Sequence, residues 1–131
     1  MKIKNTVFIG VTIMILGSGI SALAREIKSY DVTIPKFGSI TTGEIKKVDL
    51  TKGVHNNTAI GGNKRINTSI RKASNNSDIT PSYNMGPGDR ILMSYSGGAS
   101  AYKGAKTTLA LSTPLTTVVS VAAQGSWSPD E

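Results

Sequence analysis

Three short runs near the end of the chain alternate between apolar and small polar residues. They begin at Arg90, Thr107 and Thr116, and stretches rich in glycine or containing proline separate them. A two-residue period is typical of a β-strand with one buried face. The segment from Asp89 to Trp127 therefore predicts an antiparallel meander with one apolar side and one small polar side. The predicted apolar side consists of Ile91, Met93, Tyr95, Leu109, Leu111, Val119 and Val121.

Two further strands are predicted before the middle of the chain. The first covers Glu26 to Ile34 and ends at Pro35, which cannot donate a ladder hydrogen bond. The second covers Thr42 to Leu50. Its predicted inward residues are Val48 and Leu50, and its predicted outward residues are Lys47 and Asp49. Ile45 and Val48 have opposite parity, so we expect a β-bulge near residues 44–46.

The middle of the chain is poorer in strand signals. Within residues 51–65 only Thr58 to Ile60 looks extended, and Gly61 to Asn63 predicts a hairpin turn because these residues tolerate positive φ. Arg65 to Lys72 alternates again. It predicts a strand with Ile66, Thr68 and Ile70 on one side and Arg65, Asn67, Ser69 and Arg71 on the other.

No segment after residue 24 has a helical period, and glycine, asparagine, serine and threonine are abundant. Six to seven short strands in one chain of this length indicate two packed sheets or a small open barrel. We predict an all-β fold, a small antiparallel β-sandwich, with residues 25–131 as a single domain.

The first 24 residues have the pattern of an export signal. Lys2 and Lys4 precede an apolar run over residues 7–20, and small residues at positions 21–24 match a cleavage site. Three glycines interrupt the apolar run, which is also shorter than a membrane span requires. We therefore expect a cleaved signal peptide, cleavage after Ala24 and secretion of the mature chain.

Composition limits the class of partner. The chain has no cysteine, so disulfides cannot stabilise it. It carries 15 Lys and Arg against 8 Asp and Glu, a net charge of +7 at pH 7. Without Lys2 and Lys4 of the first 24 residues the charge is +5, which outside a cell favours teichoic acids, anionic lipid headgroups or acidic glycans, although it could also serve solubility alone. Scattered basic residues on an exported chain do not favour nucleic acid.

Catalytic patterns are sparse. His55 is the only histidine, no G-x-S-x-G motif is present, and the carboxylates follow no metal-binding spacing. His55 lies in an Asn-rich stretch, where we expect a solvated side chain. The sequence therefore predicts no enzyme, no metal site and no cofactor, and a small secreted hydrolase ranks third among the functions.

Two groups of residues are candidates for binding. The basic group is Lys64, Arg65, Arg71 and Lys72, with Lys46 and Lys47 as candidates for further members. An anionic polymer could lie across it; the alternative is a solvated strand face that discourages edge-to-edge pairing. The aromatic group is Tyr83 and Tyr102, beside glycine-rich loops, where rings can stack on sugars or lie at an interface. Tyr95 and Trp127 are assigned to the core.

The signal peptide, the short basic cysteine-free β-domain and an ending that runs from Thr116 through Trp127 to Asp130 resemble small exported proteins of Gram-positive bacteria. Some of these are bacteriocin-like, such as the lactococcin 972 type, a β-sandwich. The resemblance implies a non-enzymatic domain that binds an extracellular or cell-envelope target, and its most specific version is a bacteriocin-like antimicrobial protein. The alternative is a module that pairs with another protein or with itself through an exposed strand edge.

Overall fold

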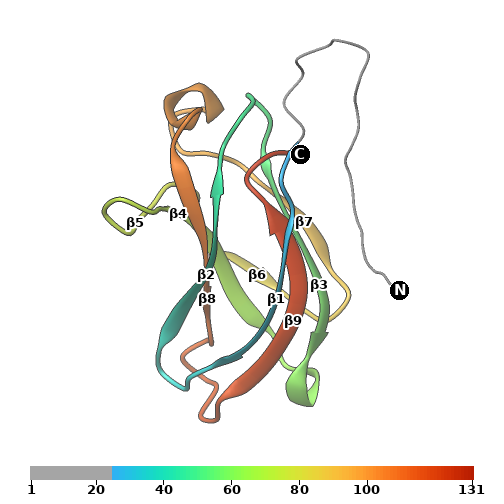
Figure 1. Ribbon diagram of the computed structural model, residues 1–131. Helices are drawn as coiled ribbons and strands as arrows, with labels where there is room; N and C mark the ends of the chain where they lie inside the picture. Colours follow the sequence, from blue (N-terminus) through green and yellow to red (C-terminus); the bar gives the residue numbers. More distant parts are fainter. Residues whose placement is uncertain (1–24) are drawn as a thin grey trace.

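The computed structural model describes residues 25–131, which form a sandwich of two antiparallel β-sheets (Figure 1). The predicted all-β sandwich is therefore confirmed, with nine strands in residues 25–131 rather than the six to seven predicted. The first sheet contains, in spatial order, β1 (Lys28–Ile34), β9 (Val121–Ser128), β3 (Gly53–Ile60) and β7 (Arg90–Met93). The second contains β2 (Ser39–Lys46), β8 (Lys106–Ser112) and β4 (Ile66–Lys72), with the short strands β5 (Ser77–Asp78) and β6 (Tyr83–Met85) both paired to β4.

The core lies between the two sheets and follows the alternation of the sequence. Ile66, Thr68 and Ile70 are buried along one side of β4, as predicted, because each second residue of a strand points to the same face. Tyr30 and Ile34 of β1 and Leu109 and Leu111 of β8 are buried in the same way. These apolar faces give the sandwich a single core, without any disulfide.

The predicted meander is wrong as a topology, although most of its faces are right. The three strands of this segment do not pair with one another: β7 pairs with β3, β8 lies between β2 and β4, and β9 lies between β1 and β3. The chain changes sheet at each connection. Alternation along a strand predicts which side is buried, but it contains no information about which neighbour completes the ladder.

Strand boundaries correct two further expectations. The final strand starts at Val121 rather than Thr116, and Val119 is 48% exposed in the preceding loop. β2 ends at Lys46, so Leu50 lies outside the strand and is 61% exposed, whereas Lys47 is fully buried. The expected bulge is present, as a register shift between Thr42 and Ile45. The shift lies before Ile45, so Lys47 points inward with the buried Ile45 two residues earlier, and the prediction that Val48 and Leu50 point inward is wrong.

β3 is the element that sequence patterning missed most. It runs over Gly53–Ile60 and is hydrogen-bonded on both sides, to β9 and to β7. His55 and Asn57 point into the core and are buried, so the expectation of a solvated His55 is wrong. His55 hydrogen-bonds with Tyr30 and Thr68, and Asn57 donates its amide to Tyr30, whereas Oδ1 of Asn57 has no hydrogen-bond partner among residues 25–131.

The Gly61–Asn63 segment is a turn with the expected positive φ, 66° at Gly62 and 55° at Asn63. It is not a hairpin turn, because β3 and β4 belong to different sheets. The segment is a 3₁₀ turn, η2 (Gly61–Asn63), that carries the chain across the sandwich, and a second one, η3 (Ala99–Tyr102), precedes β8.

The predicted signal peptide, residues 1–24, lies outside the described residues. Within residues 25–131 no helix is long and apolar enough to cross a membrane.

Candidate functional site: a lysine-rich end of the sandwich

The four predicted basic residues divide between the two ends of β4. Lys64 and Arg65 precede the strand, whereas Arg71 and Lys72 close it. Six residues of extended chain place Arg65 and Arg71 about 20 Å apart. The structure therefore brings these residues together only in pairs.

Both arginines are engaged within the protein. The Nε of Arg71 lies 2.9 Å from a carboxylate oxygen of Asp78, across the β4–β5 pair. The guanidinium of Arg65 donates to the side chain of Asn84 and lies 3.9 Å from a carboxylate oxygen of Asp89. These carboxylates offset part of the positive charge that a bound anion would otherwise meet.

The two predicted tyrosines are half-buried and hydrogen-bonded to the main chain. The hydroxyl of Tyr83 accepts the backbone N–H of Ser94 at 2.9 Å. The hydroxyl of Tyr102 donates to the carbonyl of Ser96 at 2.9 Å, and its ring lies 5.7 Å from that of Tyr95. Both tyrosines fix the loops beside β7, and part of each ring stays accessible.

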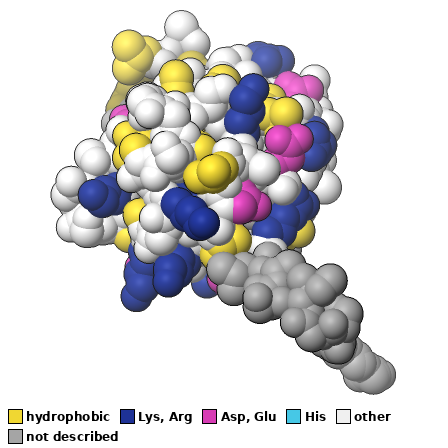
Figure 2. All heavy atoms as spheres, turned by 90° about the horizontal axis from the view of Figure 1, so that it is seen from above, with side chains coloured by type: hydrophobic (Ala, Val, Ile, Leu, Met, Phe, Trp, Pro, Cys, Tyr) yellow, Lys and Arg dark blue, Asp and Glu magenta, His cyan; other side chains and the backbone are white. Residues whose placement is uncertain are grey.

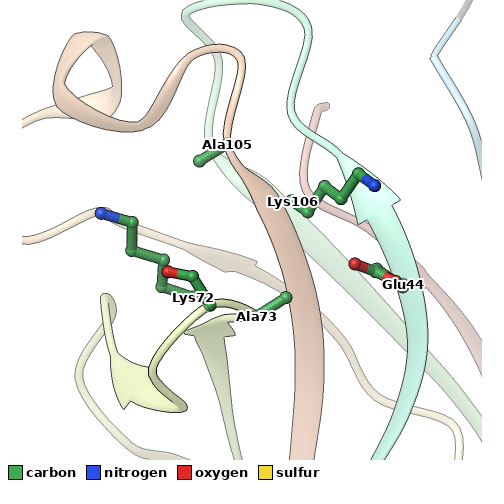
Figure 3. Close-up of a pocket in the computed structure, with 6 residues that line it drawn as sticks. Glu44, Lys72, Ala73, Ala105 and Lys106 are labelled. Carbon is green, nitrogen blue, oxygen red and sulfur yellow. The ribbon is translucent and has the colours of Figure 1, made fainter.

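Lys72 belongs to a second group of basic residues, at the end of the sandwich where β2 ends and β8 begins. We call this group the lysine end and define it as Lys46, Lys72, Lys103 and Lys106. A hollow of about 350 Å³ is lined by Lys72, Lys106 and Glu44, with Ala73 and Ala105 as small neighbours (Figure 3). A second hollow, of about 260 Å³, is lined by Lys46 and Lys103.

The lysines of this end have no carboxylate within 4.0 Å in the described part of the chain. Lys46 and Lys106 also face each other directly across the β2–β8 pair. Like charges in directly opposed positions of an antiparallel pair destabilise the sheet. Figure 2 looks onto this end and shows Lys and Arg side chains spread around it, whereas most of the visible acidic side chains lie on one side. Positive potential therefore accumulates here.

Lys47, a candidate for the basic group, does not contribute to this charge. Its ammonium lies 3.0 Å from Asp130 and is fully buried. The same nitrogen donates to the carbonyls of Thr51 at 2.6 Å and Pro129 at 3.1 Å, and it lies 4.4 Å from the centre of the Tyr95 ring. The pair ties the end of the chain to the β2–β3 loop. Local sequence offered no signal for it, because the partners are 83 residues apart.

His55 belongs to a buried polar network between the sheets. Its Nε2 lies 2.5 Å from the hydroxyl of Tyr30, and its Nδ1 lies 3.1 Å from the Thr68 hydroxyl. Asn57 donates its amide to the Tyr30 hydroxyl at 3.0 Å, so that hydroxyl has its own proton free to donate to His55. The neutral imidazole then carries its proton on Nδ1 and donates it to Thr68.

Burial governs the ionisation of this network. It lowers the pKa of His55 to about 4, because the charged imidazolium loses its hydration. It raises the pKa of Tyr30 to about 12 for the same reason, against a smaller opposite effect of the Asn57 hydrogen bond. His55 has no solvent-exposed surface, so the network holds the sheets together and offers no surface to a ligand.

No model of a known protein family matches this sequence. No relative is found among the curated proteins. Within residues 25–131, no three His, Asp or Glu side chains gather in a way that could hold a metal ion.

Proposed function

We propose that the mature chain is a secreted, non-enzymatic domain that binds an anionic polymer of a bacterial cell envelope through its lysine end. The observation that carries the proposal is the gathering of Lys46, Lys72, Lys103 and Lys106, none of which has a carboxylate within 4.0 Å in residues 25–131. Opposed lysines cost stability within the fold, and a bound polyanion would remove that cost by supplying the missing negative charge.

The predicted leader supports an extracellular location, with cleavage after Ala24. The leader has a basic start, an apolar run over residues 7–20 and a cleavage site, which together are typical of an export signal. The absence of cysteine agrees with a domain that does not depend on disulfides. Without Lys2 and Lys4 of the leader, the mature chain keeps 13 Lys and Arg against 8 Asp and Glu, and this net charge of +5 would attract the domain to envelope polymers at long range.

A binding assay with isolated cell walls or purified teichoic acid tests the proposal. The variant pair Lys72→Gln and Lys106→Gln removes two charges at the lysine end and should weaken binding about fivefold at low salt. The control pair Lys36→Gln and Lys64→Gln removes the same charge at the opposite end and should leave binding nearly unchanged. Equal losses would reduce the effect to net charge and overturn the assignment of the site.

The bacteriocin-like version of the proposal adds growth inhibition of related bacteria. Its support is the cationic β-domain together with the exported leader. Purified residues 25–131 should inhibit a sensitive relative at low salt, and the Lys72→Gln/Lys106→Gln variant should inhibit it less. Wall binding without inhibition of any relative would leave the envelope-binding domain and remove its antimicrobial role.

A further inference from the structure

Three loops lie at the end of the sandwich opposite the lysine end and the C-terminus (Figure 1), and a fourth, residues 86–89, adjoins them through the contact of Asp89 with Arg65. We call this surface the loop end and define it as residues 35–38, 61–65, 86–89 and 113–120. The 113–120 loop adjoins its neighbours on two sides. It shares a hollow of about 380 Å³ with Phe37, through Leu115, and one of about 550 Å³ with Lys64 and Arg65, through Val118 and Val119.

The loop end is unusually apolar at its tips. Four of the seven large apolar side chains exposed in residues 25–131 belong to it: Phe37 at 64%, Leu115 at 88%, Val118 at 64% and Val119 at 48%. Two hydrogen bonds fix the 113–120 loop, which carries three of these side chains. Within the loop, Thr117 donates its backbone N–H to the carbonyl of Pro114 at 2.9 Å. At its start, the hydroxyl of Thr113 donates to the carbonyl of Pro35 at 3.3 Å. Exposed apolar side chains gathered on one surface indicate a contact site.

Phe37 supplies a second, independent observation. Its φ is 56°, in the left-handed region that bulky residues rarely adopt, and its ring contributes little to the core because most of it is exposed. Glycine or asparagine would occupy this turn position at lower energy. An exposed aromatic residue kept in a strained conformation is better explained by a contact that it makes than by the stability of the fold.

The charges of the loop end identify what that contact is. Its four loops contain three basic residues, Lys36, Lys64 and Arg65, and one acidic residue, Asp89. Asp89 accepts the backbone N–H of Gly86 at 2.8 Å and lies 3.9 Å from Arg65, so its charge is offset within the protein. Lys36 and Lys64 have no carboxylate within 4.0 Å in residues 25–131.

We propose that the loop end docks on the surface of an anionic lipid bilayer. Phe37 and Leu115 enter the boundary between headgroups and acyl chains, while Lys36 and Lys64 contact the headgroup phosphates. Separate apolar tips with basic residues between them suit a soft bilayer, which can close around each tip and supply negative charge between them. This surface lies at the other end of the molecule from the lysine end, so it does not depend on the polymer-binding proposal.

Sedimentation with lipid vesicles tests the proposal on residues 25–131. The wild-type protein should sediment with vesicles of equal phosphatidylglycerol and phosphatidylcholine, and much less with phosphatidylcholine alone. The Phe37→Gly/Leu115→Ser variant should lose affinity for the mixed vesicles about tenfold or more, because two large apolar side chains no longer leave water. The control variant Ile27→Ser/Leu50→Ser removes two side chains of comparable exposure outside the loop end and should sediment like the wild type.

A stability measurement separates this role from a structural one. Phe37→Gly relieves the positive φ, so the single variant should unfold at the same or a higher urea concentration while it binds vesicles more weakly. Two results would overturn the proposal: vesicle binding that survives Phe37→Gly/Leu115→Ser, or a wild-type dimer that Leu115→Ser converts to a monomer, which would make the loop end a contact between copies.

The variants of the two ends also distinguish the two proposals. Phe37→Gly/Leu115→Ser should bind isolated cell walls like the wild type, and Lys72→Gln/Lys106→Gln should still sediment with the mixed vesicles. If the wild-type protein does not bind cell walls but does bind the mixed vesicles, the polymer-binding proposal is wrong and the bilayer-docking proposal stands. The opposite result removes bilayer docking alone.

Discussion

The ammonium of Lys47 lies 3.0 Å from the carboxylate of Asp130, and neither side chain has solvent-exposed surface. The carboxylate also accepts the backbone N–H groups of Val48 at 2.9 Å and Asp49 at 3.1 Å. The last residues of the chain thereby satisfy the backbone where β2 ends. A buried ion pair of this kind is strongly destabilising to break, because the remaining charge is left without a partner.

Lys47→Met should lower the free energy of unfolding by about 3–5 kcal/mol. The adjacent Lys46→Met, on an exposed side chain, should change it by about 0.5 kcal/mol or less. Urea denaturation of both variants checks the difference. Adding Asp130→Asn to Lys47→Met should recover part of the loss, since the unpaired charge is then removed; equal effects of Lys47→Met and Lys46→Met would contradict the buried pair.

The buried imidazole of His55 makes stability depend on pH. Above pH 6.5 the histidine is neutral in the folded and the unfolded chain, so it adds no pH dependence there. Between pH 6.5 and the folded pKa of about 4, the unfolded chain binds a proton that the folded chain does not. Stability should therefore fall as the pH drops through this window, by up to about 3 kcal/mol.

Urea unfolding at pH 7.5, 6 and 5 measures this dependence. A His55→Gln variant should be less stable at every pH, because it disturbs the contacts with Tyr30 and Thr68, yet its stability should change less between pH 7.5 and 5. A variant with the same slope as the wild type over that range would show that other groups produce the dependence.

Substitution of Gly43, the glycine of β2, should lower the stability of the fold. Its φ is 69°, and a Cβ there would lie 3.1 Å from Nε1 of Trp127 on the opposite sheet. Gly97 has a φ of 80° with no atom within 4 Å of such a Cβ, so it has the conformational cost without the contact. Gly97→Ala should cost about 1 kcal/mol, and Gly43→Ala should cost more. Thermal unfolding of the two variants compares them, and equal losses would mean that the Trp127 ring moves aside freely.

The sequence predicted the class of fold because alternation is a local property of each strand. Ile66, Thr68 and Ile70 could be assigned to one buried face from their spacing alone, and the bulge in β2 followed from the conflict between Ile45 and Val48. Trp127 was correctly placed in the core. The basic residues and the two tyrosines could be named as candidates, but the sequence did not show that the basic residues divide between the two ends of β4.

Only the tertiary structure decided which strands pair, which polar residues are buried and which loops share a surface. Each of these depends on partners far apart in the chain, as with Lys47 and Asp130 or His55 and Tyr30. A polar residue looks solvated in sequence until a distant group supplies its hydrogen bond, which explains the errors at His55 and Lys47. The loop end exists for the same reason, because three crossings between sheets bring Phe37, Lys64 and Leu115 to one end of the sandwich.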